Sequence, residues 1–375
     1  MTGAGVGAGT GTTYAAAGVD VEAGDRAVAL MREAVSRTHG PEVVGGLGGF
    51  AGLFDASALL GMRRPLLTTS TDGVGTKIAI ARALDVHDTV GVDLVAMVVD
   101  DIVVSGARPL FMTDYIACGR VVPERIADLV RGIARGCEET GTALVGGETA
   151  EHPGLMEADE YDLAGAATGV VEADAVLGPA RVREGDVVVA LASSGLHSNG
   201  YSLVRRVVAD AGWGLERHVD ELGRTLGEEL LTPTRLYTRP CLGLAADLGE
   251  GLRALSHVTG GGLAANLGRV LPAGLRADLD RGTWAPPPVV DLVGRLGGVP
   301  LADLERTLNM GVGMVAVVGP DAADEALRAL AAAGTEAWVL GAVGADDGDR
   351  GPDVTVGAKG VDGGSVRLRG VHLAR

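Results

Sequence analysis

A run of residues suited to phosphate and metal binding lies at 70–77, with the sequence STDGVGTK. It follows a β-rich run and precedes an Ile, Ala and Leu run of helical period, so glycine amides near a helix start can approach an anion. There Asp72 offers oxygen to Mg²⁺, and Lys77 offers a point charge to phosphate. The P-loop spacing GxxxxGK[ST] is absent, so a Walker-type site is not supported. An ordinary turn with a capping Asp72 and a solvated Lys77 explains this segment alone equally well.

Three acids interrupt the mostly apolar run at 89–105, namely Asp93, Asp100 and Asp101. At about 100° per residue, Asp93 and Asp100 differ by roughly 20° around a helix and Asp101 by roughly 80°, so all three can point to one side. Carboxylates on an apolar helix repel one another and lose solvation unless a cation joins them. The pattern favours a hard divalent cation that bridges phosphates over an exposed amphipathic face.

Two glycine-rich segments of the first half are further candidates for ligand contact. Residues 45–54, GGLGGFAGLF, hold four glycines in five positions and predict a loop. The segment GGETAEHPG places Glu148, Glu151 and His152 beside flexible backbone at a strand end. Metal binding, substrate contact and simple turn chemistry all remain open for these three side chains.

Two strand-to-helix turns of the second half carry hydroxyls and imidazoles. The first, SSGLHSNGY, includes Ser194, His197 and Asn199 at a helix start, where capping alone explains a Ser or Asn. It is not the GxSxG of a serine hydrolase. The second, HVTGGG, begins at His257 and satisfies the degenerate GxGxx[GA] pattern, with Asp280 where a ribose-binding acid is expected. An NAD-binding turn is therefore a competing interpretation.

Scarce residue types add weight to some of these candidates. The chain has two lysines, Lys77 and Lys359, three asparagines, Asn199, Asn266 and Asn309, and no glutamine. Where Arg, Ala and Gly have replaced other residues so widely, a remaining Lys or Asn is weakly favoured for a role that its substitutes cannot fill.

The overall composition excludes several classes of protein. A chain of 375 residues with 47% hydrophobic and 22% charged residues can bury a sizeable core, and its length suits two domains. A formal net charge of −17 makes nucleic acid a poor partner. Three cysteines without a CxxC pair indicate neither a disulfide framework nor zinc. No apolar run of about 18 residues and no signal-like start is present, so we expect no membrane insertion and a cytoplasmic location.

Helices and strands alternate along the chain and predict an α/β (α+β) fold of two domains. Helices are expected at 25–37, 89–105, 124–140, 232–248 and 321–333, and strands at 66–71, 109–119, 143–147, 161–171, 186–195, 253–258, 312–319 and 337–343. Gly-rich composition predicts flexible tails at both ends. The expected divisions are a tail at 1–18, an amino-terminal domain at 19–175, a carboxy-terminal α/β domain at 176–345 and a tail at 346–375.

In this order, the segments resemble the phosphoribosylformylglycinamidine cyclo-ligase family, also called aminoimidazole ribonucleotide synthetases. The resemblance runs from about Tyr14 to Ala342 and includes PEVVGGLGGF, STDGVGTK, GVDLVAMVVDD, LVGGETAEHPG, SSGLHSNGYSLVR and HVTGGGLAANLGRVLP. It implies a homodimer in which the 19–175 domains bind ATP and pair through their sheets. It also implies an ATP- and Mg²⁺-dependent ring closure of formylglycinamidine ribonucleotide in purine biosynthesis, with release of ADP and phosphate.

The resemblance also implies roles for particular residues. Asp72, Asp93 and Asp101 are expected to hold Mg²⁺, and His197, His257, Asp101 and Lys77 to act in catalysis. ATP is expected to contact Gly45, Gly46, Gly48, Gly49, Phe50, Thr71, Asp72, Gly73, Gly75, Thr76, Lys77, Asp93, Gly147 and Glu148, with 45–49 as a mobile cover. The nucleotide substrate is expected to contact Ser194, His197, Ser198, Asn199, Thr259, Gly260, Gly261, Gly262 and Asn309.

Three positions depart from the family pattern. Asp100 stands where Asn is expected, Arg108 replaces an acid, and Arg32 takes the place of a lysine near the nucleotide. Thiamine monophosphate kinases, selenophosphate synthetases and formylglycinamidine amidotransferases share the acid and glycine pattern, but not GGETAEHPG with SSGLHSNGYS in this arrangement. A non-catalytic nucleotide-binding regulator and an NAD-dependent enzyme are the alternatives from other classes.

Overall fold

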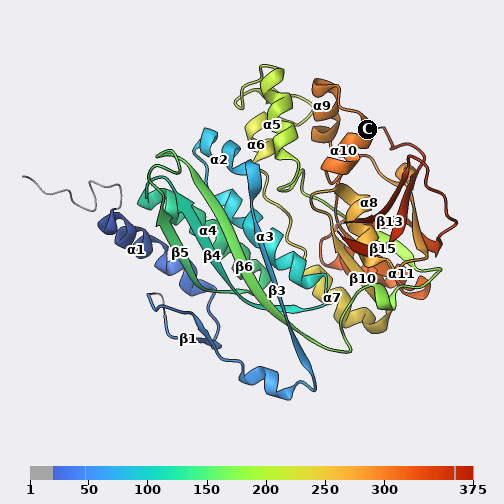
Figure 1. Cartoon of the computed structure of the whole chain (residues 1–375), viewed down its shortest axis with the longest axis horizontal. Helices are drawn as coiled ribbons and strands as arrows, with labels where there is room; N and C mark the ends of the chain where they lie inside the picture. Colours follow the sequence, from blue (N-terminus) through green and yellow to red (C-terminus); the bar gives the residue numbers. More distant parts are fainter. Residues whose placement is uncertain (1–19, 47, 359, 375) are drawn as a thin grey trace, which may run out of the picture.

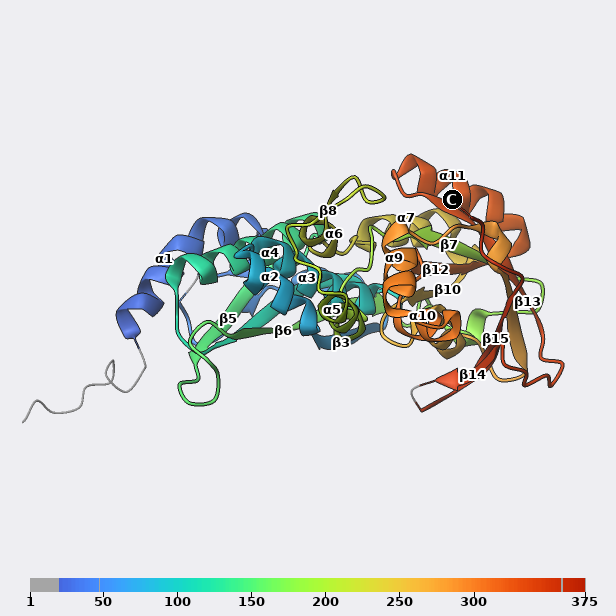
Figure 2. The ribbon, with the colours of Figure 1, turned by 90° about the horizontal axis from the view of Figure 1, so that it is seen from above.

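The computed structural model describes residues 20–46, 48–358 and 360–374, and the tail predicted at 1–18 lies outside them. Two sheets lie side by side in a mixed α/β chain of two halves (Figures 1 and 2). No helix in the described part of the chain is both long and apolar enough to span a bilayer. The amino-terminal half contains β1 (Val43–Val44), β2 (Leu53–Phe54), β3 (Pro65–Gly73), β4 (Arg108–Cys118), β5 (Ala143–Glu151), β6 (Tyr161–Glu172), α1 (Val21–Arg37), α2 (Ile78–Leu84), α3 (Asp88–Val103) and α4 (Pro123–Thr140).

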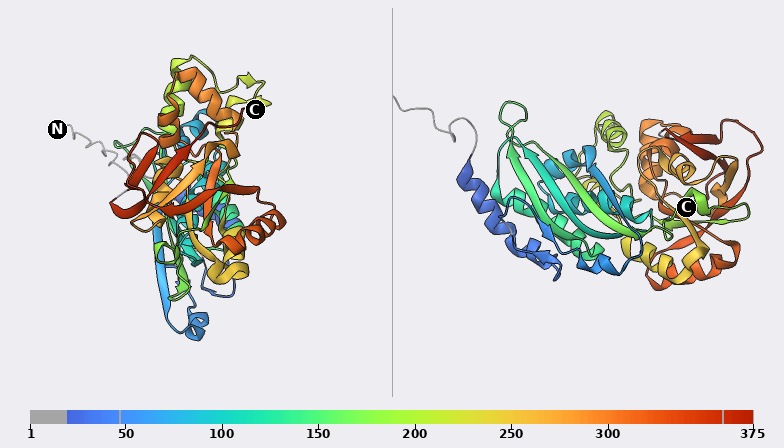
Figure 3. Two further views of the ribbon diagram at one scale, coloured as in Figure 1. Left: turned by 90° about the vertical axis from the view of Figure 1, so that its right-hand side faces the viewer. Right: turned by 60° about the horizontal axis from the view of Figure 1, so that its bottom comes forward.

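The amino-terminal sheet has the order β3, β6, β4, β5 and is covered by helices on one face. Its strand β6 alternates buried Leu163 and Ala167 with exposed Asp162 and Ala164, the period-2 pattern of a half-covered sheet. Helix α3 packs on the buried face and is apolar almost all round because α4 covers its other side. Figure 3 shows the opposite face of the sheet without a covering helix in the described residues.

The carboxy-terminal sheet has the order β10, β12, β7, β13, β11, β15, β14. Its strands are β7 (Val187–Ala192), β10 (Leu252–His257), β11 (Leu275–Asp280), β12 (Val312–Val318), β13 (Ala337–Ala345), β14 (Val354–Ala358) and β15 (Val361–Arg369), with β8 (His218–Val219) and β9 (Arg224–Thr225) as a separate pair. The helices are α5 (Tyr201–Asp210), α6 (Leu226–Leu230), α7 (Thr238–Leu248), α8 (Gly262–Leu267), α9 (Pro288–Gly297), α10 (Leu301–Thr307) and α11 (Ala323–Ala332).

Strand β7 shows how this sheet separates two cores. Val189 shares a buried cluster with Leu330 of α11, whereas Val188 and Ala190 share another with Leu263 of α8. Both faces of the strand are thus covered, which explains its continuous Val and Ala run. The first cluster continues into the amino-terminal half.

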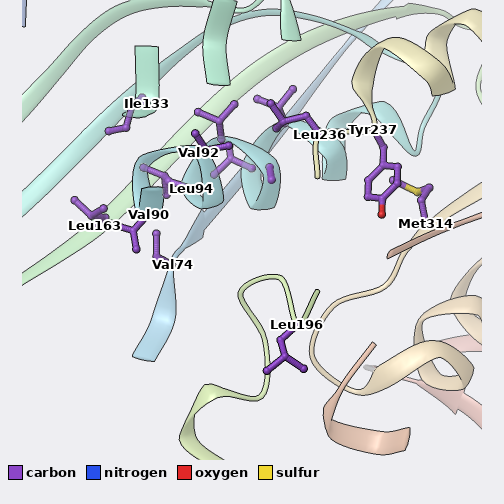
Figure 4. Close-up of a cluster of buried hydrophobic side chains, with 14 of the residues drawn as sticks. Val74, Val90, Val92, Leu94, Ile133, Leu163, Leu196, Leu236, Tyr237 and Met314 are labelled. Carbon is purple, nitrogen blue, oxygen red and sulfur yellow. The ribbon is translucent and has the colours of Figure 1, made fainter. Parts of the chain in front are cut away.

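Figure 4 shows where this shared core crosses between the halves. Leu94 of α3 lies in the same cluster as Leu236 and Tyr237 of the second half and Met314 of β12. Continuous apolar burial therefore fixes the two halves against each other, and the groups at their junction are held by packing on both sides.

Two predicted boundaries are wrong for identifiable reasons. The helix expected at 232–248 begins only at Thr238, because Pro233 disfavours helical backbone before it and Thr234 binds the carboxylate of Asp93. The acidic segment after Gly147, expected as a loop, continues β5 to Glu151 and pairs in parallel with β4.

The prediction of a flexible tail at 346–375 is also wrong. Strand β15 pairs in parallel with β11 and buries Val366 completely. The aspartates that suggested a loose segment are held by basic side chains: Asp346 accepts from the buried Arg276 at 2.6 Å, and Asp347 accepts from Arg367 at 3.2 Å. Composition alone hid this strand because glycines and paired charges surround its few apolar residues.

We expect Val366→Ala to lower the free energy of unfolding by about 2 kcal/mol, since it leaves a gap in a fully buried position. Val371→Ala is the matched control: Val371 is 78% exposed, and its truncation is expected to change stability by less than about 0.5 kcal/mol. Urea unfolding followed by circular dichroism measures both. Equal stabilities for the two variants would mean that β15 does not form in solution.

Candidate active site

The end of β3 and the turn after it meet the 193–202 turn of the second half. Ser198 donates from Oγ to the carbonyl oxygen of Val74 at 2.7 Å, and the hydroxyls of Thr76 and Ser202 lie 3.1 Å apart. Asn199 reaches Met97 of α3, with 3.7 Å between Nδ2 and Sδ. Two segments that the sequence marked separately for phosphate and substrate contact are therefore in direct contact.

A histidine and a carboxylate pair across this junction. Nδ1 of His257, at the end of β10, lies 2.9 Å from Oδ1 of Asp101 on α3. Burial alone lowers the pKa of His257, but the Asp101 hydrogen bond and nearby carboxylate charges outweigh burial and raise the pKa above its ordinary value. These carboxylates belong to Asp72, Asp100 and Asp101. The imidazole is suited to give a proton to a reacting oxygen.

The second predicted histidine has the opposite environment. Nε2 of His197 accepts from the backbone N–H of Ser194 at 3.1 Å, which leaves the proton of a neutral ring on Nδ1. That Nδ1 is buried and meets no hydrogen-bond partner among the described residues. Burial, and then the positive charges of His257, Lys77 and Arg235, hold the pKa of His197 well below its ordinary value. A neutral donor and a protonatable imidazole thus meet at one junction, which is typical of acid and base groups with divided roles.

The structure corrects the roles predicted for Lys77 and Asp93. Lys77 is fully buried, and its Nζ lies 2.8 Å from Oδ2 of Asp93, 3.0 Å from the carbonyl oxygen of His197 and 2.7 Å from that of Thr232. Asp93 is fully buried and also accepts from the backbone and hydroxyl of Thr234. Neither side chain faces a phosphate or a metal here, because each satisfies the other inside the core.

Asp100, the acid found where the family has Asn, is also turned inward. Its carboxylate accepts from the backbone N–H of Tyr237 at 3.0 Å and from the hydroxyl of Thr238 at 2.9 Å, at the start of α7. Burial raises the pKa of Asp100 to about 6, against the charge of His257 and these two hydrogen bonds, which lower it. Its role is to cap a helix of the other half.

This raised pKa predicts how the stability of the protein depends on pH. The folded chain binds the Asp100 proton more tightly than the unfolded chain, so the stabilisation is complete below about pH 4 and is lost as pH rises through about 6. We expect Asp100→Asn to leave stability near pH 4 almost unchanged and to raise the free energy of unfolding at pH 8 by up to about 3 kcal/mol. Urea unfolding at the two pH values tests this, and a loss of stability at pH 8 would contradict it.

Two of the three predicted metal ligands are at least partly exposed at the junction. Asp72 is exposed at the end of β3, and the side chain of Asp101 is 38% exposed. Within the described ranges, no three His, Cys, Asp or Glu side chains are arranged to hold a metal ion by themselves. Any cation held here would therefore take most of its ligands from outside the protein.

Four of the predicted ATP-contacting glycines, Gly46, Gly48, Gly49 and Gly147, line a cavity elsewhere in the amino-terminal half. The cavity, of about 260 Å³, is bounded by apolar residues of α1, such as Met31, and by Gly46, Gly48, Gly147 and Glu148. Strands β1 and β2 and the intervening loop carry its other wall, where Phe50 is fully exposed. Figures 1 and 2 show this wall on the side of the sheet away from the carboxy-terminal half. The predicted cover therefore does not lie over His197 and His257 of its own chain.

The sequence analysis missed Asp114, which lies in this cavity. Sheet register puts Asp72, Gly165, Asp114 and Gly147 in one row across the four strands. Burial raises the pKa of Asp114 to about 7. A Cβ at position 147 would lie 1.7 Å from its Oδ1, so any larger residue there would displace the Asp114 carboxylate. The signal that could have found Asp114 is an acid within the apolar strand PLFMTDY.

Two asparagines support the turns that carry the predicted substrate contacts. Asn309 is 3% exposed, donates to the carbonyl oxygen of Gly195 at 2.8 Å and accepts from Gly311, so it holds the 193–197 turn from behind. Asn266 does the same for the TGGG turn, donating to the carbonyl oxygens of Thr259 at 3.1 Å and Gly262 at 2.8 Å. Two of the three scarce asparagines therefore shape turns.

The TGGG turn does not form a dinucleotide-binding unit. Strand β10 pairs antiparallel with β12, whereas that unit requires two parallel strands joined by the helix. Gly262 is required because a Cβ would lie 1.8 Å from the carbonyl oxygen of Glu305, which explains the glycine by packing. Asp280 caps a local turn by accepting from Gly282. The NAD-dependent alternative therefore loses its structural basis.

Polar side chains from both halves meet at one buried junction, and the fold around it is that of a two-domain α/β enzyme. Solved structures with this fold include thiamine-monophosphate kinase from Stenotrophomonas maltophilia K279a, with TM-score 0.62 and 18% identity over 92% of this chain and 97% of that one. The hydrogenase maturation protein HypE in complex with ATP also has TM-score 0.62, with 17% identity over 87% of each chain. At these identities the likeness shows the fold alone.

Sequence comparison identifies the family. Residues 55–171 match the AIR synthase related protein N-terminal domain, and residues 183–353 match the corresponding C-terminal domain. Phosphoribosylformylglycinamidine cyclo-ligases from Geobacillus sp. (strain WCH70) and Shouchella clausii (strain KSM-K16) are 48% and 51% identical, each over 89% of this chain and 96% of the relative. That from Sorangium cellulosum (strain So ce56) is 52% identical over 88% of this chain. The chain belongs to the phosphoribosylformylglycinamidine cyclo-ligase family.

Proposed function

We propose that this chain closes the imidazole ring of aminoimidazole ribonucleotide in purine biosynthesis, consuming formylglycinamidine ribonucleotide and ATP and releasing ADP and phosphate. The observation that carries the proposal is the identity of about 50%, over 96% of their length, to relatives that bear the cyclo-ligase name. The meeting of Asp72, Asp101, His197 and His257 at one junction supports it, because phosphoryl transfer and ring closure need charge stabilisation and proton transfer at one place.

The two histidines have different roles in the proposed reaction. The formyl oxygen of the substrate attacks the γ-phosphorus of ATP and ADP leaves; the amidine nitrogen then attacks the activated carbon, a proton is lost, and the C–O bond to phosphate breaks. His257, paired with Asp101 at 2.9 Å, can hold a proton beside the departing phosphate oxygen. The neutral His197 can donate from its unpartnered Nδ1 to the same developing charge.

Mg²⁺ is the cation that this donor set suits best. Mg²⁺ commonly takes one or two carboxylates from the protein and its other ligands from water and substrate phosphates. Asp72 and Asp101 would hold it, because both are accessible carboxylates whose charge acts on His257. When bound, Mg²⁺ neutralises charge on the transferring phosphoryl group. Asp93 is left out of this set because it pairs with the buried Lys77.

A homodimer would reconcile the two separated regions that the sequence predicted as one site. The uncovered face of the amino-terminal sheet presents Leu67 and Tyr115, which are 66% and 41% exposed, and pairing it with a second copy would cover them. The cavity beside Asp114 and the loop carrying Phe50, where ATP is expected to bind, lie at the β5 edge of the same sheet. Three free, buried cysteines are compatible with the reducing cytoplasm that we expect.

The decisive experiment supplies formylglycinamidine ribonucleotide and Mg-ATP and measures ADP, phosphate and the aminoimidazole together. Equal yields of the three are expected. ATP turnover that ignores this substrate would instead place the chain in a sister activity. Sedimentation of the purified chain tests the dimer, and a monomer at micromolar concentration would contradict it. Thermal stabilisation by NAD and not by Mg-ATP would revive the oxidoreductase alternative.

A further inference from the structure

The buried Lys77 links three segments from the two halves of the molecule. Its Nζ contacts carboxylate oxygens of Asp93 on α3, the carbonyl oxygen of His197 and the carbonyl oxygen of Thr232. An ammonium group has three protons, and all three acceptors are oxygens at 2.7–3.0 Å, so each proton has a partner. Asp93 in turn binds Thr234, which fixes the 232–237 segment to α3.

One of these contacts restrains a strained residue. His197 has φ of 61°, in the left-handed backbone region that residues other than glycine adopt only with strain. The Lys77 contact to its carbonyl oxygen and the Ser194 N–H on its Nε2 hold the residue at both ends. Ser194 is itself tied to the Thr232 segment by a 2.7 Å hydrogen bond from Oγ to the carbonyl oxygen of Pro233. The ring orientation that leaves Nδ1–H unpartnered therefore depends on this network.

We propose that Lys77 is a positioning residue for the ring-closing reaction, and that it acts by holding the backbone of His197 so that Nδ1–H faces the reacting nucleotide. This inference rests on the proposed function and replaces the phosphate contact expected from the sequence. It also explains why a lysine persists in a chain with only two of them. A compact ammonium donates from one atom in three directions, whereas the five N–H groups of the larger guanidinium of Arg all lie in one plane.

Charge supports the same assignment. After burial and the charge of His257, the charge of Lys77 is the next cause that lowers the pKa of His197. Lys77 thus favours the neutral ring that the Ser194 N–H requires. Removing Lys77 alone would leave the charge of Asp93 without a counter-charge in the core and would strongly destabilise the fold.

The test is therefore the paired variant Lys77→Met/Asp93→Asn, which removes both charges and keeps an acceptor for Thr234. We expect kcat to fall about 100-fold, because a small displacement of a catalytic group has an effect of that size. The KM for Mg-ATP is expected to stay within about threefold, because Lys77 does not touch the nucleotide. A tenfold rise in this KM with kcat retained would overturn the inference and restore a phosphate contact.

A comparison on a His197→Ala background distinguishes a positioning role of Lys77 from a general loss of structure. On a His197→Ala background, the paired variant is expected to lower kcat by less than about threefold, since the residue it positions is already absent. A full 100-fold loss on that background would overturn the inference. Arg276→Met is the matched control: Arg276 is also a buried cation bound to carboxylates, but it lies in the carboxy-terminal sheet. It is expected to lower the Tm without lowering kcat of the folded fraction.

A measurement without substrate keeps this inference separate from the proposed function. Imidazole ¹⁵N chemical shifts, assigned to His197 by comparison with His197→Ala, are expected to show the Nδ1–H tautomer in the wild-type chain and a changed pattern in the paired variant. An unchanged pattern would overturn the inference. Failure of the wild-type chain to make aminoimidazole would contradict only the proposed function, because the ring shifts still report whether Lys77 holds His197.

Discussion

His257→Asn is expected to lower kcat for aminoimidazole formation about 10²- to 10³-fold, the range for loss of a positioned acid or base. The asparagine amide can keep the hydrogen bond to Asp101, so what is lost is the group that titrates. Because neighbouring carboxylates raise the pKa of His257 above its ordinary value, the acid form persists to higher pH than it does in an unperturbed histidine. Activity that needs this form falls as pH rises through the raised pKa, and the variant should lack that alkaline limb. Steady-state kinetics from pH 6 to 9 measure both effects.

His87→Asn provides a matched control for His257. His87 is also buried, with Nε2 at 2.9 Å from Asp85 and Nδ1 at 2.9 Å from the hydroxyl of Tyr161, but it lies before α3 and away from the junction. Its replacement is expected to lower the Tm and to leave kcat and its pH profile unchanged. If both variants lose stability and activity in parallel, His257 is a structural residue and the proposed proton transfer is wrong.

Asp72→Asn is expected to lower turnover about 100-fold and to raise the Mg²⁺ concentration needed for half-maximal rate, with little change in stability. The carboxylate is exposed at the end of β3, so its loss removes charge from the site without opening the core. Its side chain accepts from the N–H of Gly73, a contact that an Asn oxygen can keep. Initial rates over a Mg²⁺ titration, together with urea unfolding, measure the two effects separately.

Asp55→Asn is the control for this substitution. Asp55 is likewise exposed and accepts hydrogen bonds only locally, from the backbone and hydroxyl of Ser57. Its replacement is expected to leave both the rate and the Mg²⁺ requirement unchanged. Equal effects at positions 55 and 72 would show that the response reflects general surface charge rather than a cation site.

Periodicity predicted most of the fold, and the structure shows where it failed. The strand run at 161–171 and the apolar length of α3 were sufficient, because each element buries one face or stripe of its own. Strand β15 was missed because Val366 is surrounded by glycines and by charges that pair only after folding. The start of α7 was misplaced because Thr234 binds Asp93, 141 positions away.

The sequence by itself determined the family, because family membership depends on residue type, order and local spacing. It also predicted the phosphate-type turn at Asp72 and roles for the two histidines. Only the tertiary structure decided which groups can meet a ligand. Lys77 and Asp93 look like ligands of phosphate and metal in sequence, yet they are fully buried and bind each other. Asp114 lies in a strand, as the sequence predicted, but it also lines a cavity. Burial and distant partners set the charge and accessibility of a side chain, and neither is written in its local sequence.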